Sequence, residues 1–96
     1  MGFFGNGNSV EQKIKAGAVI VDVRSVDEYQ DEHFPKSLNI PVNELSGRAG
    51  EIGPKDKPVV LYCASGSRSA MGTRILKSLG FTDVVNAGGL NDMPGF

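Results

Sequence analysis

Two short apolar runs constrain the fold of this chain more than any other feature of its sequence. Residues 18–23 read AVIVDV, and residues 58–62 read PVVLY. Both runs are near-continuous and rich in β-branched side chains, so they lack the alternation expected of a strand with one face in water. Strands of this kind are buried on both faces, as in parallel sheets that are covered by helices. The sequence therefore predicts a parallel sheet built around residues 18–23 and 59–62.

Helical segments alternate with these runs. Ser9 with Gln12, and Ser25 with Glu28, have the spacing of capping boxes, so helices are predicted to begin at both serines. A longer helix is predicted over residues 69–79. Its inward-facing side chains are predicted to be those of Met71, Ile75, Leu76 and Leu79.

Shorter elements complete the predicted fold. Strands are expected at residues 38–40 and 83–86, helical turns at residues 42–49, and a turn at Gly88 and Gly89. Because strands alternate with helices over short loops, we predict an α/β fold, a three-layer α/β/α sandwich with a small parallel sheet of four to five strands.

The length and composition of the chain limit what kind of protein it can be. Its 96 residues suffice for one domain, predicted over residues 9–96, after a glycine- and asparagine-rich segment at residues 1–8 that is expected to be flexible. The net charge of −1, with lysines and arginines scattered along the chain, gives no basis for binding nucleic acid or a membrane surface. No apolar run is long enough to span a membrane, and the N-terminus lacks the pattern of a signal peptide.

The single cysteine and single histidine narrow the possibilities further. One cysteine cannot form an internal disulfide, and a free thiol is best maintained in a reducing cytosol, so a cytoplasmic location is expected. His33 has no second histidine or cysteine to share a metal ion, so it is interpreted as a hydrogen-bonded structural residue. Neither a metal nor an organic cofactor is implied.

The cysteine opens the loop CASGSRS, which joins the second apolar run to the predicted helix. Ligands of parallel sheets bind at the carboxyl ends of the strands, where Cys63 stands. Small residues allow backbone N–H groups to turn inward as an anion-binding nest, and both the helix start near Ser69 and the guanidinium of Arg68 favour negative charge there. We therefore predict a lowered pKa and a nucleophilic thiolate for Cys63. The alternative is that Cys63 is a small buried apolar residue and Arg68 a solvated charge.

This loop resembles the active-site loop of the rhodanese family, which commonly reads Cys, two variable residues, Gly, one variable residue, Arg and Ser. Further family motifs follow in the same order: D-V-R at residues 22–24, E-Y at 28–29, E-H-F in place of G-H-I at 32–34, an apolar residue with Asn-Ile-Pro at 38–41, G-F at 80–81 and G-G at 88–89. The resemblance covers residues 9–93. Two departures are that Met93 stands where the family often has tryptophan, and that residues 35–37 replace small residues.

The resemblance implies a single rhodanese-like domain that transfers sulfur. A thiolate at Cys63 would take the outer sulfur of thiosulfate, expel sulfite and become a persulfide, which cyanide or a thiol would then discharge. Arg68 would bind the leaving sulfite or orient the loop. The substrate-binding residues would be Ala64, Ser65, Gly66, Ser67 and Ser69, chiefly through their backbone N–H groups. A thioredoxin-like protein is one possible acceptor, and a monomer is the simplest assembly for a small chain with one exposed thiol.

Two other functions remain open from the residues. Cysteine phosphatases and arsenate reductases have a related loop with one more residue between Cys and Arg, whereas four residues separate Cys63 from Arg68 here. These phosphatases also commonly place His directly before Cys, where this chain has Tyr62, and the loop offers no general acid. A non-catalytic binding module on the same fold is the other alternative.

Several residues around the loop have structural interpretations. Asp22 is predicted to accept backbone N–H bonds or to pair with Arg24, rather than to hold Arg68. Arg24 and Glu28, four residues apart near a helix start, are predicted to form an ion pair. Gly88 and Gly89 are expected to allow positive φ and a close approach of backbone beside the loop.

Overall fold

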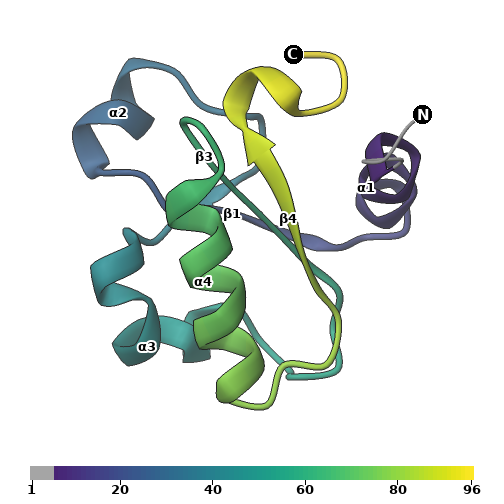
Figure 1. Cartoon of the computed structure of the whole chain (residues 1–96), viewed down its shortest axis with the longest axis vertical. Helices are drawn as coiled ribbons and strands as arrows, with labels where there is room; N and C mark the ends of the chain where they lie inside the picture. The colour runs from purple at the N-terminus through teal and green to yellow at the C-terminus, as the bar shows by residue number, and fades with distance from the viewer. Residues whose placement is uncertain (1–5) are drawn as a thin grey trace.

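The computed structural model describes residues 6–96, which form a four-stranded parallel sheet with helices around it (Figure 1). The sheet has the strand order β2-β1-β3-β4. Its strands are β1 (Val19–Asp22), β2 (Leu38–Asn39), β3 (Val59–Cys63) and β4 (Val84–Gly89). The helices are α1 (Asn6–Lys15), α2 (Val26–Asp31), α3 (Leu45–Arg48) and α4 (Ser67–Ser78), with the 3-10 turns η1 (Val42–Glu44), η2 (Ala49–Glu51) and η3 (Leu90–Asp92).

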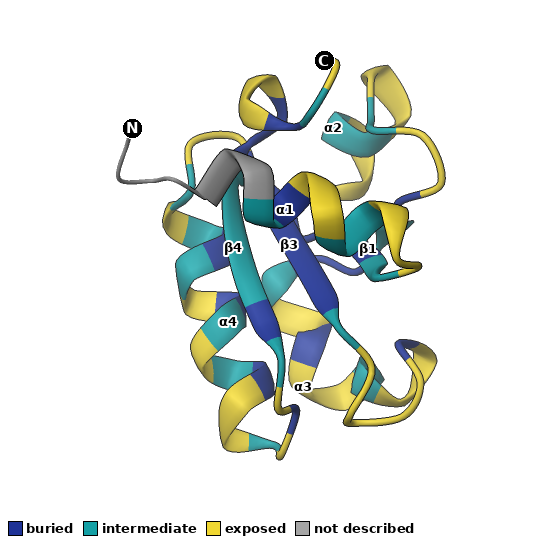
Figure 2. Ribbon diagram, turned by 90° about the vertical axis from the view of Figure 1, so that its right-hand side faces the viewer, coloured by how far each residue is buried: buried dark blue, intermediate teal, exposed yellow. Residues whose placement is uncertain are grey.

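Apolar clusters on both faces of the sheet make the fold a three-layer sandwich, as predicted. Alternate side chains of β1 and β3 enter opposite clusters, because successive residues of a strand point to opposite faces. One cluster packs Leu45 and Leu76, from α3 and α4, against Leu61 and Cys63. The other packs Val10 of α1 and the C-terminal residues against Val60 and Tyr62. The central strand β3 is buried along its whole length (Figure 2).

Two predicted helix starts are wrong. Helix α1 begins at Asn6, so Ser9 lies inside the helix and does not cap it. Helix α4 begins at Ser67, because Gly66 adopts a left-handed conformation with φ of 102° and serves as its N-cap, so Ser69 also lies inside a helix. Residues 1–5 fall outside the described residues, so the flexibility predicted for residues 1–8 remains a prediction there. By contrast, the capping box of Ser25 and Glu28 is confirmed.

The last strand is longer than predicted, because Gly88 and Gly89 belong to β4 instead of forming a turn. The β3–β4 register changes between Leu61 and Cys63, which pair with Asn86 and Gly89 respectively. Two residues of β3 therefore span three of β4, which is a β-bulge. Gly88, with φ of 95°, lies in this bulge.

The predicted inward position of Met71 is also wrong, since 49% of its surface is exposed. The buried residues of α4 are Ser69, Gly72 and Leu76, so Gly72 takes the position that faces the sheet. A Cβ at Gly72 would lie 3.1 Å from a methyl group of Leu45 and 3.2 Å from one of Leu61. Helix α4 therefore packs closely at Gly72, and Met71, one residue away around the helix, is directed outward.

The C-terminal segment packs on the sheet without the tryptophan that the family often has. Met93 is 2% exposed and joins Leu90, Tyr62 and Val10 in the cluster beneath α1. The thioether of Met93 thus fills this part of the core. None of the helices among residues 6–96 is long and apolar enough to cross a membrane.

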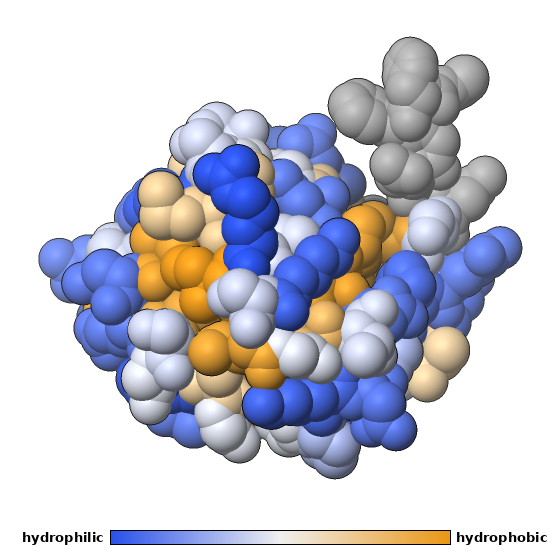
Figure 3. All heavy atoms as spheres, turned by 60° about the horizontal axis from the view of Figure 1, so that its bottom comes forward, coloured by the Kyte–Doolittle hydropathy of each residue, from blue (hydrophilic) through white to orange (hydrophobic). Residues whose placement is uncertain are grey.

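Two shallow hollows lie away from the cysteine loop. One, of about 470 Å³, lies between the end of α1 and residues 34–38, and the other, of about 240 Å³, lies between α3 and residues 79–81. Seen from the end opposite to the carboxyl ends of the strands, the surface shows apolar patches broken up by polar side chains (Figure 3). Neither hollow is lined by residues 63–69.

Candidate active site

Cys63 ends the buried strand β3, at the carboxyl edge of the sheet where the sequence predicts the site. Its side chain is 0% exposed and belongs to the apolar cluster beneath α3 and α4. The expectation of an exposed thiol is therefore wrong. The argument for a monomer that rested on it no longer holds, and the oligomeric state stays a prediction. The loop residues Ala64 and Ser65, which follow Cys63 in the chain, are both exposed.

Hydrogen-bond donors nevertheless converge on the buried sulfur. The N–H of Gly66 lies 3.0 Å from Cys63 Sγ and that of Ser69 lies 3.4 Å away, while Ser69 Oγ is at 3.3 Å. Burial is the largest influence on the pKa of this thiol and raises it, but the bonds from the hydroxyl and N–H of Ser69 and from the backbone of Gly66 and Ser65 together lower it below the ordinary value. The structure therefore supports the predicted low pKa of Cys63 and contradicts a purely apolar environment for it.

The loop residues contribute unequally to this arrangement. The side chains of Ala64, Ser65 and Ser67 are exposed, so these residues can act on the sulfur only through their backbone. Direct N–H bonds to the sulfur come from Gly66 and Ser69, and the backbone of Ser65 adds to them in lowering the thiol pKa. Of the predicted nest of residues 64–69, the backbone of Ser65, Gly66 and Ser69 thus acts on the sulfur, and the first turn of α4 supplies Ser69.

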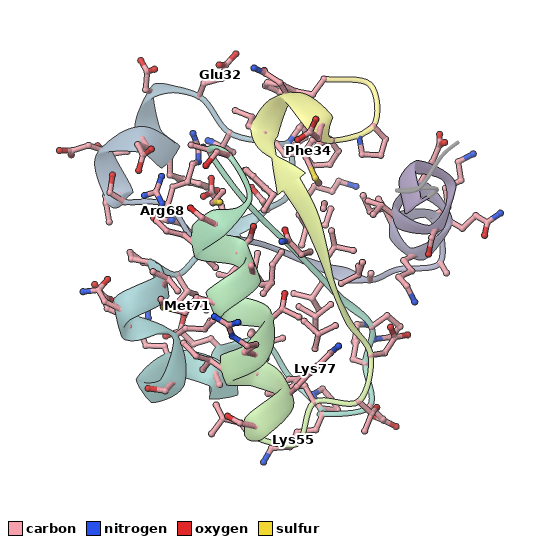
Figure 4. All side chains as sticks on the ribbon, in the orientation of Figure 1. Glu32, Phe34, Lys55, Arg68, Met71 and Lys77 are labelled. Carbon is pink, nitrogen blue, oxygen red and sulfur yellow. The ribbon has the colours of Figure 1, made fainter. Side chains whose placement is uncertain are left out.

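Arg68 does not extend freely into the loop, because Glu28 of α2 holds its guanidinium. Figure 4 shows Arg68 at the start of α4, on the side of that helix that faces α2. The two nitrogens Nη1 and Nη2 lie 2.8 and 3.0 Å from the two carboxylate oxygens of Glu28, which is a bidentate ion pair. Glu28 also accepts the backbone N–H of Ser25, and these bonds, chiefly those from Arg68, lower its pKa to about 2. The predicted pairing of Glu28 with Arg24 is therefore wrong, and the first turns of α2 and α4 are joined instead.

Arg24 pairs with Asp22, as the structural interpretation of Asp22 predicts. The carboxylate of Asp22 accepts the backbone N–H of Arg24 at 2.9 Å and its guanidinium at 2.7–3.1 Å, and both side chains are buried. Arg24 also donates to the carbonyl of Glu32 at 2.7 Å, so the buried pair fixes the segment that follows α2.

His33 is a hydrogen-bonded structural residue, as predicted. Its Nδ1 lies 2.8 Å from the carbonyl oxygen of Tyr29, and its ring stacks on that of Tyr29 with centroids 3.8 Å apart. Within residues 6–96, no cluster of His, Cys, Asp and Glu side chains is arranged to hold a metal ion.

Asn86 is the residue near the sulfur to which the sequence analysis gave no role. It lies on β4, and the strand's alternation directs its side chain to the same face of the sheet as Cys63. Its amide nitrogen donates to the carbonyl of Gly66 at 3.1 Å, and its amide oxygen lies 2.6 Å from Ser69 Oγ. The alternation of the predicted strand over residues 83–86 could have indicated this face, but the bonds of Asn86 to Gly66 and Ser69 depend on how the loop packs against β4, which the sequence pattern does not encode.

The close approach predicted at the double glycine is confirmed. The expected positive φ is found at Gly88 but not at Gly89, whose φ is −95°, and a Cβ at Gly89 would collide with the carbonyl group of Ala64. The backbone of β4 therefore lies directly against the cysteine loop.

Comparison with known proteins agrees with this geometry. The family profile described as Rhodanese-like domain matches residues 7–93. The chain belongs to the rhodanese-like domain family. Among curated relatives, the thiosulfate sulfurtransferase PspE of Escherichia coli is 40% identical over 74 residues, which are 76% of this chain and 71% of PspE. The putative sulfur carrier protein YrkF of Bacillus subtilis is 39% identical over 79% of this chain but only 41% of its own length.

Solved rhodanese structures share the fold. A structure described as rhodanese with anions from E. coli has a TM-score of 0.77 and 38% sequence identity, and the match covers 81% of this chain and 93% of that one. The human single-domain sulfurtransferase TSTD1 has a TM-score of 0.78 and 29% identity, with 88% of each chain covered. The rhodanese-like fold predicted from the cysteine loop and its accompanying motifs is thus confirmed.

Proposed function

We propose that this rhodanese-like protein is a sulfurtransferase that carries sulfane sulfur as a persulfide on Cys63. The observation that supports it most directly is the set of two N–H donors and one hydroxyl within 3.4 Å of Cys63 Sγ. Donors held in a buried site stabilise negative charge on sulfur without having to reorganise during the reaction. The same donors can serve the thiolate before the transfer and the anionic persulfide after it.

In the first step, the thiolate of Cys63 attacks the outer sulfur of a donor such as thiosulfate. A new S–S bond forms to Cys63, the S–S bond of thiosulfate breaks, and sulfite leaves with the electron pair. In the second step, cyanide or a thiol attacks the outer sulfur of the persulfide, so the acceptor leaves with that sulfur and the thiolate returns. Two successive displacements of this kind predict ping-pong kinetics.

We assign Arg68 to orienting the loop, the second of the two roles considered from the sequence. Its guanidinium is bound by both oxygens of Glu28, so these contacts would have to break before it could bind sulfite with the same geometry. Its positive charge still lies close enough to interact with Cys63. Residues Ala64, Ser65, Gly66, Ser67 and Ser69 are proposed to surround the transferred sulfur.

The loop also favours sulfur transfer over phosphate chemistry. Its four residues between Cys63 and Arg68 turn tightly, since Gly66 N–H lies 3.0 Å from Sγ. A tetrahedral phosphate needs a wider ring of donors than a single outer sulfur does. Tyr62, which precedes the cysteine, points to the opposite face of the sheet, where its hydroxyl meets Phe34 and Ser37, so it cannot act as a general acid in the loop.

The physiological acceptor is proposed to be a thiol, and a thioredoxin-like protein is a suitable source. A reduced Cys63 is needed at the start of each cycle, which is consistent with a cytoplasmic location. The relatives PspE and YrkF support sulfur chemistry through their names, thiosulfate sulfurtransferase and putative sulfur carrier protein, but neither specifies the donor or the acceptor of this chain.

The test is to measure intact mass after incubation with thiosulfate, followed by the formation of thiocyanate when cyanide is added. We expect the mass to rise by one sulfur atom, the gain to disappear with a thiol, and Cys63→Ser to abolish both results. If no sulfur is gained, the alternative of a non-catalytic binding module is favoured. Cys63-dependent hydrolysis of p-nitrophenyl phosphate would instead favour a phosphatase.

A further inference from the structure

The orientation of the Asn86 side chain is fixed by its hydrogen bonds. Its nitrogen Nδ2 lies 3.1 Å from the carbonyl oxygen of Gly66, which can only accept a hydrogen bond. The oxygen Oδ1 must therefore be the atom that faces the N–H of Gly88 at 2.9 Å and the hydroxyl of Ser69 at 2.6 Å. Since an amide oxygen only accepts, the proton of the Ser69 hydroxyl points to Asn86 in this arrangement.

The hydroxyl of Ser69 has one proton but two important neighbours. Its oxygen lies 3.3 Å from Cys63 Sγ and 2.6 Å from Asn86 Oδ1, while the carbonyl oxygens of Gly66 and Gly88 are at 3.2 and 3.4 Å. When the proton points to Asn86, Ser69 can only accept from sulfur, which requires the neutral thiol. When Cys63 is a thiolate, the proton has to turn to the sulfur to stabilise it.

We propose that Asn86 is a positioning residue that competes with Cys63 for the single hydroxyl proton of Ser69. Asn86 holds the proton while Cys63 is neutral and releases it when the thiolate forms. The competition weakens the stabilisation that Ser69 gives to the thiolate, so the sulfur stays more basic than it otherwise would be. A more basic thiolate is a stronger nucleophile, although less of it is present at a given pH. The inference rests on the proposed function, because it concerns how Cys63 keeps its reactivity towards sulfur.

Other groups near the sulfur are charged and must be kept constant in any test. Arg68 of α4 is paired with Glu28 of α2, and Asp92 of η3 accepts the N–H of Gly89 at 2.8 Å. The buried pair of Asp22 and Arg24 lies at the same edge of the sheet. None of these is altered in the variants below, so their electrostatic effects cancel when variants are compared.

A double-mutant cycle tests the competition. The thiolate is titrated by its ultraviolet absorbance near 240 nm, which is clean here because Cys63 is the only cysteine and Cys63→Ser supplies the blank. The proteins compared are the unaltered chain, Asn86→Ala, Ser69→Ala and the double variant. Because Asn86→Ala also removes the bond to Gly66, its effect is measured with and without the Ser69 hydroxyl.

We expect Ser69→Ala to disfavour the thiolate. We expect Asn86→Ala to increase the ionisation constant of the Cys63 thiol. This increase should be about three- to tenfold larger when Ser69 is present than when it is replaced by alanine. Equal effects in both backgrounds would overturn the proposal, because Asn86 would then act only through its bonds with Gly66 and Gly88. A difference of opposite sign would overturn it as well.

A second measurement compares the unaltered chain with Ser69→Ala, so it does not depend on the stability of the Asn86 variants. As the thiol ionises, the hydroxyl proton leaves Asn86 Oδ1, so the remaining bond from Gly88 N–H should shorten. We expect the NMR signal of that N–H to move downfield with the midpoint of the thiol, and to lose most of this movement in Ser69→Ala. An equal movement in both proteins would contradict the proposal.

Neither measurement uses a sulfur donor, so its failure is distinguishable from failure of the proposed function. A chain that shows the coupling but gains no sulfur would refute sulfur transfer alone. A chain that gains sulfur without the coupling would refute only the role of Asn86.

Discussion

At the scale of single residues, Cys63 shows how backbone geometry can oppose the effect of burial. Full burial by itself raises the pKa of a thiol, because the thiolate loses its hydration. Here the first turn of α4 supplies donors at 3.0–3.4 Å, and the pKa falls instead. The reactive form of the residue is thus produced by the place where the strand ends and the helix begins.

The rate of sulfur loading from thiosulfate should rise with pH, and the midpoint of this rise should lie below the ordinary pKa of a cysteine thiol. Because the pKa is lowered in the folded protein, thiolate formation also stabilises the fold above the unfolded pKa, and this contribution disappears as pH falls through the folded pKa. Ser69→Ala removes one donor, so the midpoint should move to higher pH. Ser78→Ala on the same helix, whose hydroxyl binds Ile75 and not the sulfur, should leave the profile unchanged.

Glu28→Gln should clearly lower the rate of sulfur transfer but only slightly lower the free energy of unfolding. The substitution removes the charge that orients Arg68, but the pair is about one-third exposed on both sides, so after solvent screening the loss in unfolding free energy should be only about 0.5 kcal/mol. The low pKa of Glu28 keeps the pair intact above its ordinary pKa of 4.5, and its contribution fades between that pH and about 2. Asp27→Asn, in the same turn, is the control for charge, and an equal loss of activity there would contradict a specific role for Glu28.

The ion pairs illustrate which residue-scale features a sequence can predict. The pairing of Asp22 with Arg24 is local and was predicted, because their backbone turn brings them together. The partner of Glu28 is 40 residues away and depends on how α2 and α4 pack, which local spacing does not encode. The i,i+4 spacing of Arg24 and Glu28 was therefore misleading. The cysteine and arginine themselves were predicted because their loop has a distinctive local pattern.

At the scale of elements, buried strands were easier to predict than the ends of helices. The apolar runs located β1 and β3 to within one or two residues, because burial on both faces leaves a clear composition. The starts of α1 and α4 were missed, since serine is common both at helix caps and in first turns. The end of β4 was missed because glycine pairs are typical of turns, whereas here they form a bulge against the cysteine loop.

Gly89→Ala tests this contact between elements. The added methyl group would collide with the carbonyl of Ala64, so β4 or the loop must move, and we expect a loss of about 1–3 kcal/mol in unfolding free energy. Because the loop holds the sulfur, the thiol pKa should change too. Gly47→Ala, at a helical site with open space, should instead be neutral or stabilising by up to about 1 kcal/mol. Similar urea unfolding curves for the two variants would contradict the close approach.

Arg24→Met tests the buried pair that anchors the segment after α2. Without the guanidinium, the fully buried carboxylate of Asp22 keeps only the bond from the backbone N–H of residue 24. We therefore expect a loss of about 3–5 kcal/mol in the free energy of unfolding, measured by urea unfolding. The double variant Asp22→Asn with Arg24→Met should recover part of this loss, because no charge then remains buried. If the double variant is no more stable than Arg24→Met, the uncompensated charge is not the cause.

At the scale of the whole molecule, the sheet separates two cores that serve different purposes. The core beneath α3 and α4 includes Cys63 and supports the site, while the core beneath α1 holds Tyr62 and the C-terminal residues. Because β3 contributes alternate side chains to both, the two cores cannot unfold independently, and a small domain of this kind is expected to unfold in one cooperative step. A defect in the second core should therefore lower global stability without changing the chemistry of the sulfur.

Met93→Ala provides that defect, and Met71→Ala is its matched control. Met93 is 2% exposed in the second core, so truncation should cost about 2–4 kcal/mol, whereas Met71 is 49% exposed and its truncation should cost little. Both variants should unfold in a single transition in urea, and Met93→Ala should keep the thiol pKa of the unaltered chain at temperatures where it is folded. A shifted thiol pKa in Met93→Ala would mean that the sheet transmits packing defects to the site. An equal loss of stability in Met71→Ala would mean that α4 turns a different face to the sheet, one that places Met71 inward and Gly72 outward.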